Sequence, residues 1–249
     1  MIKKEVCIMK KNIALFISGV FLLSLAAFPG TGQSVEDILQ KMIENQGGKK
    51  TLESIEDTTM SGTIELAQMG LSGNITVYKK EPEKRRVDVE VMGMLITQAY
   101  DGAMAWWVNP QTGATEEMPE TEAAGMKRES MPSVAILYPK KYGLSHALKG
   151  TEQIEGKDHF ILEQTYSDGF KVTLYLDSKT YLVTKTKGTS NTQMGEVEFE
   201  QFVSDYKKVN GMMIPHSITT YQNGAEYMKI TLTEVKFNTG LEDSFFKMN

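Results

Sequence analysis

The sequence predicts an α+β fold that is mainly β: one large, curled antiparallel sheet, or incomplete β-barrel, with a helical lid. From about residue 58, apolar and polar residues alternate in successive runs, as in antiparallel strands with one dry and one wet face. Turn dipeptides that accept the positive φ of tight hairpins, such as Asp168-Gly169 and Asn210-Gly211, separate many of these runs. A sheet of about ten strands curls instead of staying flat, and helices over its concave side then enclose an apolar space.

We interpret residues 1–33 as a signal peptide for export. Four lysines precede a 16-residue apolar run, 13–28, and small residues with a proline follow it. This is the order of regions in a secretory signal. The alternative, a membrane anchor, needs about 20 apolar residues, and this run is shorter. We therefore expect residues 34–249 to form one soluble domain in the periplasm of a Gram-negative cell, with the cleavage site left open.

Composition excludes several classes of function. The full chain has a net charge of −5, and removal of residues 1–33, which hold four lysines and Glu5, makes this −8. A nucleic-acid partner is not expected, because phosphate binding needs a clustered positive surface. The single cysteine, Cys7, lies in the expected signal peptide. The exported chain then has no disulfide, no thiol nucleophile and no cysteine-built zinc site.

Two helical patterns are expected before the first strand. Ser34, with Asp37 three residues later, is typical of a helix N-terminus, and an apolar stripe at helical spacing follows over residues 35–43. Gly47-Gly48 ends this helix. A shorter helical turn that contains Leu52 and Ile55 is expected next.

Alternation then predicts the strands. In the first half they cover residues 58–66, 71–77, 87–91 and 95–100, with a further short strand around 106–107. In the second half they cover residues 157–166, 170–177, 181–188, 196–203, 213–221 and 227–237. Strands joined by short hairpins pair with one another, so we expect a long antiparallel meander.

Segment 115–148 interrupts this meander. Pro119, Pro132 and Pro139 divide it into stretches rich in Glu, Ala and Met or in Val, Ile and Leu. We expect two short helices, near 121–130 and 133–138. An insertion of this length between strands is more often a lid than a plain linker, so we expect these helices to cover the concave side.

Patterns for catalysis or metal binding are sparse. The three histidines, His146, His159 and His216, show no metal-ligand spacing, and two of them lie in predicted strands, where a structural role is expected. No GxSxG elbow occurs, and residues 150–157 lack the spacing of a phosphate-binding loop. We therefore predict a protein that is not an enzyme and that uses no cofactor and no metal.

A basic cluster surrounds Pro82. It consists of Lys79, Lys80, Lys84, Arg85 and Arg86, and Glu81 and Glu83 lie within it. We interpret it as a solvated, mixed-charge strand end. The alternative is a contact for an anion or a lipid headgroup at the rim of a pocket.

The candidate ligand site is apolar. Without residues 1–33 the chain keeps 14 methionines, and methionine suits surfaces that repack around variable apolar ligands, although filling of gaps in the core is the alternative for each one. The adjacent tryptophans point to opposite faces of their strand, so that one can pack inside and the other at the rim. We predict a cavity lined from the sheet, from its mouth and from the lid by Met92, Met94, Ile96, Trp106, Trp107, Met126, Met131, Val134 and Leu137.

Several short stretches resemble the LolA-type outer-membrane lipoprotein-sorting family and its divergent relatives. They are residues 73–82, Tyr100-Asp101-Gly102 with Trp106, Trp107 and Pro110, Val209-Asn210-Gly211, Ile214-Pro215-His216, and 235–238. Together they span most of residues 34–249. The resemblance implies an incomplete antiparallel barrel with a helical lid over a hydrophobic cavity. It also implies a carrier that shields the acyl chains of lipoproteins between membrane-bound donor and acceptor proteins.

The chain departs from this family at two positions. The family carrier has an arginine directly before the strand proline and an aromatic residue three positions after it, both linked to lipoprotein handling, where this chain has Glu81 and Arg85. We expect a non-enzymatic carrier of lipoproteins or other lipids, and the departures leave the sorting activity itself open. The alternative is an envelope sensor or interaction module that uses the same scaffold to bind a partner's apolar segment.

Overall fold

The computed structural model describes residues 32–248 except 110–111 and 193–194, and residues 33–249 form one compact unit. The expected signal peptide lies outside the described residues, so the signal peptide and the domain boundary after residue 33 stay predictions. Among the described residues, no helix has both the length and the apolar character needed to cross a bilayer.

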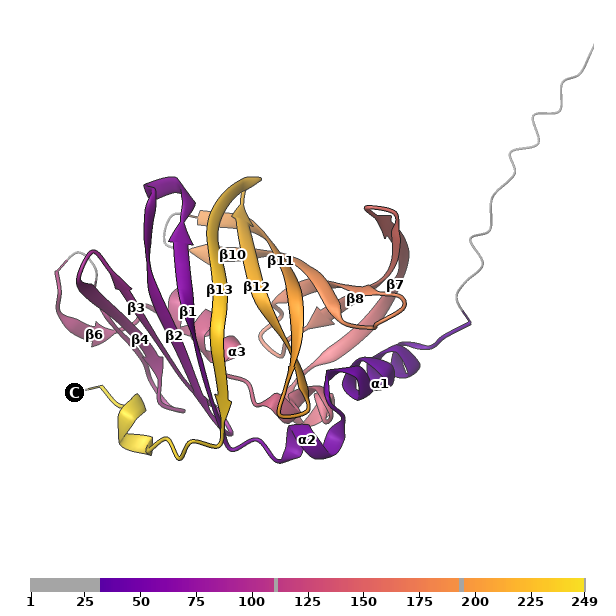
Figure 1. The fold of residues 1–249 in the computed structure, drawn as a ribbon, viewed down its shortest axis with the longest axis horizontal. Coiled ribbons are helices and arrows are strands. Elements are labelled where there is room, and N and C mark those ends of the chain that lie inside the picture. The colour runs from indigo at the N-terminus through magenta and orange to yellow at the C-terminus, as the bar shows by residue number, and fades with distance from the viewer. Residues whose placement is uncertain (1–31, 110–111, 193–194, 249) are drawn as a thin grey trace, which may run out of the picture. The chain divides into compact units, whose positions relative to one another are not determined.

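The predicted fold class is confirmed, since the described residues contain one antiparallel sheet of thirteen strands that curls without closing (Figure 1). The strands are β1 Asp57–Leu66, β2 Leu71–Lys80, β3 Lys84–Val91, β4 Met94–Tyr100, β5 Ala105–Val108, β6 Thr115–Glu117, β7 Ser145–Ile154, β8 Lys157–Thr165, β9 Lys171–Asp177, β10 Val183–Thr192, β11 Gly195–Val209, β12 Met212–Gln222 and β13 Ala225–Phe237. Their order across the sheet is 6-5-4-3-2-1-13-12-11-10-9-8-7.

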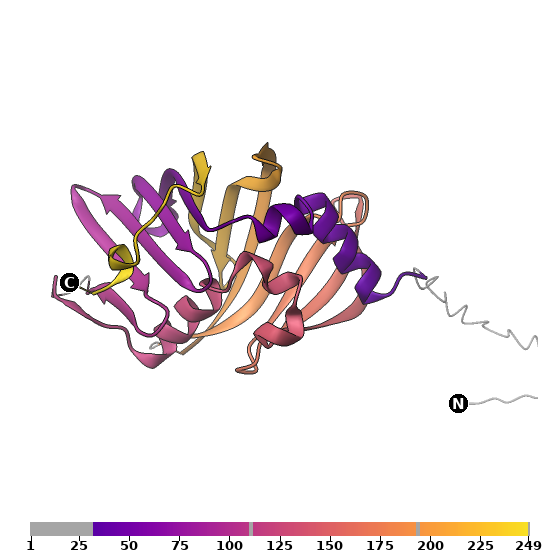
Figure 2. The same ribbon diagram turned by 90° about the horizontal axis from the view of Figure 1, so that it is seen from below.

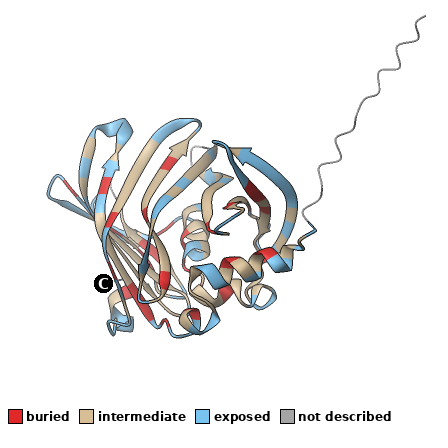
Figure 3. Cartoon of the chain, turned by 45° about the vertical axis from the view of Figure 1, so that its right-hand side comes forward, coloured by how far each residue is buried: buried red, intermediate tan, exposed pale blue. Residues whose placement is uncertain are grey.

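The sheet is two meanders joined, rather than the single meander that the sequence predicts. The first strand, β1, pairs with the last, β13, from Thr58 opposite Phe237 to Leu66 opposite Met228. The two edge strands, β6 and β7, are consecutive in the chain but do not pair. The segment between them crosses the concave side instead, which places the lid inside the curve of the sheet (Figure 3).

Helix α1 (Val35–Gln46) has the predicted cap. The Ser34 hydroxyl accepts a hydrogen bond from the Asp37 N–H at 3.1 Å, and the Asp37 carboxylate accepts one from the Ser34 N–H at 3.0 Å. Ile38 and Met42 pack on a core from β8 and β9. Gly47 ends the helix with φ 142°, next to Gly211, where a Cβ would lie 2.8 Å from the Gly211 carbonyl oxygen. The short α2 (Lys49–Glu53) follows.

The lid begins with helix α3 (Glu120–Glu129), close to the predicted 121–130. The expected second helix over 133–138 is present only as a shorter 3₁₀ helix. Two short 3₁₀ turns, η2 (Ser133–Ile136) and η3 (Pro139–Tyr142), occupy this region. Pro139 explains the break, because proline lacks an N–H and its ring disfavours helical geometry in the residue before it.

Edge strands β6 and β7 are not predicted from the sequence. β6 has three residues, too few for an alternating pattern. In β7 the register shifts between Leu148 and Gly150, and the strand is mostly exposed, so its apolar residues do not alternate regularly. Residues 150–157, which lack the spacing of a phosphate-binding loop, form the end of β7, a turn at Glu155-Gly156 where both residues have positive φ, and the start of β8.

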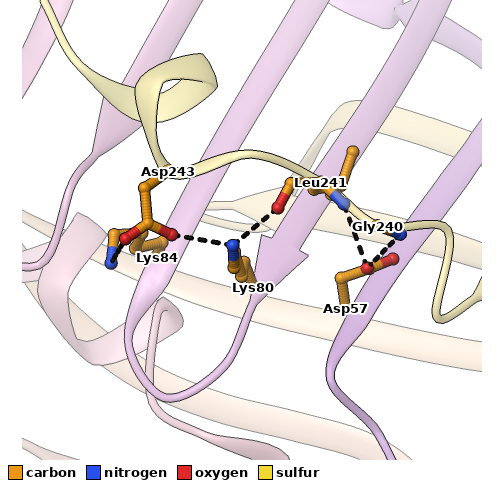
Figure 4. A network of polar contacts seen from close by, with 6 residues as sticks. All are labelled: Asp57, Lys80, Lys84, Gly240, Leu241 and Asp243. Atoms are coloured by element: carbon orange, nitrogen blue, oxygen red, sulfur yellow. Dashed lines mark hydrogen bonds and ion pairs between the residues drawn. The ribbon is translucent and has the colours of Figure 1, made fainter.

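The C-terminal segment after β13 crosses the convex face of β1–β5 and is held by charged groups (Figure 4). Asp57 accepts hydrogen bonds from the N–H groups of Thr239, Gly240 and Leu241 at 2.7–3.2 Å. Lys80 forms a 2.8 Å ion pair with Asp243 and donates a hydrogen bond to the Leu241 carbonyl. The segment ends in the turn Asp243–Phe246 (η4).

Candidate functional site

Helix α3 lies over the concave face and touches both halves of the sheet: β4 and β5 on one side, β10 on the other. Gly125, Arg128 and Glu129 of this helix line a cavity of about 310 Å³ whose other wall is formed by strands β8–β11 and the β8–β9 turn. We call it the groove cavity. The helix therefore roofs part of the hollow that the curled sheet leaves.

A second cavity of about 300 Å³, the inner cavity, lies between α1, the 131–136 segment and β8–β10. Most of its lining is apolar and includes Met42, Ile136, Leu144, Leu174 and Val183. Both cavities share four lining residues, Arg128, Gln164, Tyr166 and Leu174, so they adjoin along one face of the sheet (Figure 2 shows α1 and the lid beside these strands).

A third hollow lies beside the inner cavity, between α3, η3 and the β8–β9 turn. This outer pocket has a volume of about 620 Å³ and shares Arg128, Met131 and Tyr166 with the inner cavity. These three side chains form the boundary between the two. The two adjoining hollows are thus amphiphilic together, with a mostly apolar lining on one side of these residues and charged side chains on the other.

Arg128 occupies the junction of these hollows. Its guanidinium forms a 2.5 Å ion pair with Asp168 and stacks 4.0 Å from the centre of the Phe170 ring. Burial acts to raise the pKa of Asp168, but hydrogen bonds from the Phe170 N–H and from Arg128 outweigh it and lower that pKa. Asp168 is therefore ionised at neutral pH and keeps Arg128 in place.

An apolar patch covers the concave face in the other half of the sheet. We call it the strand patch; it consists of Ile64, Leu66, Leu71, Ile75, Val77, Val87, Val89, Val91, Met228 and Ile230, all from strands. Met228 pairs with Thr220, and Thr220 pairs with Gln201, which lines the groove cavity. Residues opposite one another in a sheet share a face, so the strand patch and the groove cavity lie on the same side.

Two buried polar atoms have no hydrogen-bond partner among the described residues: Trp107 Nε1 and Thr220 Oγ1. Trp107 packs in the cluster of Met126 and Tyr100, and Thr220 lies in the row between Gln201 and Met228. Both therefore belong to the concave face. A buried donor without a partner costs about 1–3 kcal/mol, so a guest with an acceptor would be favoured at either place.

The basic cluster around Pro82 is not a solvated strand end. Its side chains are about 17–28% exposed where they form ion pairs. Lys79 donates a 3.0 Å hydrogen bond to the Met131 carbonyl, and burial lowers its pKa. Arg85 pairs with Glu129 at 3.1 Å, and the Glu81 carboxylate accepts the Ser133 N–H at 3.0 Å.

These contacts, which we call the lid latches, tie β2 and β3 to the end of α3 and the residues after it. Lys80, Lys84 and Arg86 instead hold the C-terminal segment on the convex face. Both positions that depart from the resembled family, Glu81 and Arg85, thus contact the lid.

The lid residues among the predicted lining set fall into three places. Met131 lines the inner cavity and the outer pocket. Val134 and Leu137 pack on Leu52 of α2 and its neighbours. Met126 is buried beside Trp107 under α3. The structure brings Met126 and Trp107 together, and it brings Val134 and Leu137 together, but it does not join all of them around one cavity.

The sheet residues of that set are more scattered. Ile96 is half-buried opposite Val89 of the strand patch. Met92 is 74% exposed in the β3–β4 turn and Met94, the first residue after it, is 61% exposed, so their expected place in a cavity lining is not met in this structure. Trp106 lies on the convex face, where its indole N–H donates to the Phe246 carbonyl at 2.8 Å. Contact of any of the nine residues with a ligand stays a prediction.

Sequence reasoning missed the side chains that line the groove and inner cavities, above all Arg128, Tyr166 and Leu174. Leu162, Gln164 and Tyr166 are two residues apart in a predicted strand, and this spacing could have placed their side chains on one face of the sheet. Nothing in the sequence indicates that Arg128 of the lid meets that face, because the contact joins segments 40 residues apart.

No protein-family model matches the chain, and no curated protein matches it in sequence. Solved structures do share its fold. A LolA superfamily protein from Nitrosomonas europaea superposes with a TM-score of 0.60 at 16% identity, over 86% of this chain and 98% of that one. A DUF1329 family protein from Desulfovibrio piger gives 0.59 at 14% identity, over 86% and 97%.

An outer membrane lipoprotein-sorting protein domain from Vibrio parahaemolyticus gives a TM-score of 0.58 at 19% identity, over 86% of this chain and 97% of that one. At these identities the likeness concerns the fold. The chain has a divergent LolA-like fold, in agreement with the resemblance found in its sequence.

Proposed function

We propose that this protein is an exported, periplasmic carrier that binds lipoproteins or other lipids and shields their acyl chains in the hollow on the concave side of its sheet. The observation that supports this most directly is the pair of adjoining cavities beneath α1 and the lid, together with the strand patch, to which no helix residue of the described chain contributes. The members of this patch are buried or half-buried, so a guest that reaches the concave face there meets an apolar wall.

The energetics explain why a carrier is needed. Burial of one methylene is worth about 0.8 kcal/mol, so an acyl chain of about 16 carbons represents on the order of 10 kcal/mol. A lipid with such a chain does not cross water unaided. A hollow with adjoining apolar walls offsets part of this cost, and movement of the lid lets the chain pass to an acceptor that binds it more tightly.

The finer proposal is a role in outer-membrane lipoprotein sorting, with membrane-bound donor and acceptor proteins as partners. It is supported by the likeness in fold to the Vibrio parahaemolyticus lipoprotein-sorting domain and by the sequence resemblance. Glu81 and Arg85 occupy the lid latches, so this protein would control its lid with different side chains from those of the resembled family.

Binding rather than catalysis is proposed because the acidic groups and arginines nearest the hollow pair with one another. Arg128 and Asp168 pair with each other, and Arg85 pairs with Glu129. Among the described residues, no group of three histidine, cysteine or acidic side chains is arranged to hold a metal ion.

The test is recovery and displacement of bound lipid. Organic extraction and native mass spectrometry of the purified protein should give acyl species, and added fatty acid should displace an apolar fluorescent dye. Leu174 lines both cavities, so Leu174→Trp, whose indole displaces about two methylenes of the guest, should weaken binding about tenfold. Leu95→Trp, at a site that is 56% exposed, is the matched control and should bind like the parent.

Two results would overturn the proposal. One is a protein that carries no extractable lipid and never displaces the dye. The other is recovery from an envelope extract with one stoichiometric protein partner and no lipid, which is the behaviour of a sensor or interaction module on the same scaffold.

A further inference from the structure

The outer pocket concentrates positive charge in an acidic protein. Lys127, Arg128, Lys140 and Lys141 line it, against two acidic side chains, Glu83 and Asp168. The chain as a whole has a net charge of −5. The pocket therefore has an excess of two positive charges although the whole chain is negative. A positive concave site favours an anionic guest.

The lysines of this pocket are available to a ligand. Lys127, Lys140 and Lys141 are exposed, and in the described part of the chain none of the three forms an ion pair. Lys141 has its ammonium 5.0 Å from the centre of the Tyr142 ring. Of the four basic side chains that line the pocket, Arg128 alone forms an ion pair, with Asp168, and it is part of the pocket wall.

The pocket adjoins the mostly apolar inner cavity. Arg128, Met131 and Tyr166 separate it from the inner cavity, where Ile136, Leu174 and other apolar side chains follow. Burial raises the pKa of Tyr166, with a smaller opposing effect from its hydrogen bond with Gln164, so its phenol is a neutral group at this boundary. Charged side chains lie on one side of this boundary and apolar side chains lie on the other.

From this arrangement we propose that the outer pocket binds the anionic head of an amphiphile, a carboxylate or a phosphate, while a single hydrocarbon chain extends past Met131 into the inner cavity. The proposal rests on the proposed function, because the tail must enter the hollow assigned to acyl chains, and it adds the class of head group. Lysine suits this role, since its mobile, hydrated ammonium holds a charged head without fixing its geometry.

The volumes have room for one head and at least one chain. The outer pocket holds about 620 Å³ and the inner cavity about 300 Å³. Binding sites for single small molecules have volumes of roughly 300–1,000 Å³, so the two together are large enough for one amphiphile.

The experiment compares three probes by dye displacement and calorimetry: a saturated fatty acid, the fatty alcohol of the same length, and inorganic phosphate. The test variant is Lys127→Gln/Lys140→Gln/Lys141→Gln. Its charge-matched control is Lys157→Gln/Lys179→Gln/Lys208→Gln, three exposed lysines outside the pocket. Glu83→Gln removes a negative charge from the pocket and is the variant with the opposite sign.

We expect the pocket variant to bind the fatty acid about tenfold more weakly and the alcohol unchanged, and added salt to reduce the difference. Glu83→Gln should bind the fatty acid about twofold more tightly. The control variant should bind both like the parent. Thermal midpoints of all variants measured alongside exclude loss of fold as the cause.

Three outcomes would overturn the head-group proposal. They are equal loss of acid and alcohol in the pocket variant, equal loss in the pocket and control variants, and inorganic phosphate binding as tightly as the fatty acid, which would make this a free-anion site without a tail. If the alcohol still binds in these cases, the carrier function stands. Failure of both acid and alcohol to bind the parent protein would refute the carrier function itself.

Discussion

A few polar side chains hold the C-terminal segment on the sheet, and Asp57 accepts several of the hydrogen bonds that do so. Its side chain is 3% exposed and accepts hydrogen bonds from three successive N–H groups and the Thr239 hydroxyl. Burial acts to raise the pKa of Asp57, but the hydrogen bonds from Thr239, Leu241 and Gly240 outweigh it and lower the pKa below 3.8. The C-terminal segment therefore depends on an ionised carboxylate.

Asp57→Asn should destabilise the protein by about 1.5–3 kcal/mol at pH 6, because hydrogen bonds to a charged acceptor are worth that much. A lowered pKa in the folded state gives stability that is full above the unfolded value of 3.8 and is lost as the pH falls through the folded value. The difference between parent and variant should therefore shrink below about pH 4. Urea unfolding at pH 6 and pH 3 checks this, and a difference that does not change with pH would contradict it.

At this scale the sequence predicts what is local and misses what is distant. The Ser34–Asp37 cap depends on residues three apart and is confirmed. Met92 and Met94 continue the alternating pattern, but Met92 lies in the turn between β3 and β4 and Met94 is the first residue of β4. Both side chains are therefore exposed to solvent. Arg128 gains its role only from Asp168 and Phe170, which a different segment supplies.

Among the elements, the lid is the one whose attachment is most open to change. The latches on α3 and the residues after it are three polar contacts, from Lys79, Glu81 and Arg85. The apolar contacts of the lid are made by Met126 in α3 and by Val134, Ile136 and Leu137 after it. Pro132 and Pro139 divide it into short turns. The sequence indicates these breaks and the lid itself, but not that β2 and β3 hold it, since the latches depend on how the sheet curls.

Arg85→Gln should loosen the lid. The ion pair with Glu129 is partly exposed and worth up to about 1 kcal/mol, so bound dye should exchange up to about fivefold faster with little loss of stability. Stopped-flow displacement of the dye measures this rate. Lys149→Gln breaks a comparable exposed pair with Glu163 on β7 and β8 and should leave the rate unchanged. Equal rates in all three proteins would show that the latch does not control access.

For the whole molecule, alternation and turn dipeptides are enough to predict an antiparallel, curled sheet, but not which strands form its edges. The β1–β13 pairing joins the two ends of the domain, and its register depends on strands more than 150 residues apart. That pairing leaves β6 and β7 at opposite edges of the sheet. The segment that joins them, which contains the lid, therefore runs from one edge to the other, and in this structure it does so across the concave side. Which residues line the cavities therefore depends on the β1–β13 pairing, which local sequence patterns do not specify.

A guest held by this whole arrangement should stabilise it, because a ligand that binds only the folded state adds its binding free energy to the free energy of unfolding. At about a hundredfold excess over the dissociation constant the gain is about 2.7 kcal/mol. For a domain of this size each kcal/mol raises the thermal midpoint by roughly 2–4 °C, so saturating fatty acid should raise it by about 5–10 °C. Leu174→Trp, which narrows both cavities and should weaken binding about tenfold, should show about half this rise at the same concentration, and scanning calorimetry measures both. An equal rise in the two proteins would mean that the fatty acid binds elsewhere, for example at the exposed methionines of the β3–β4 turn, and not in the hollow.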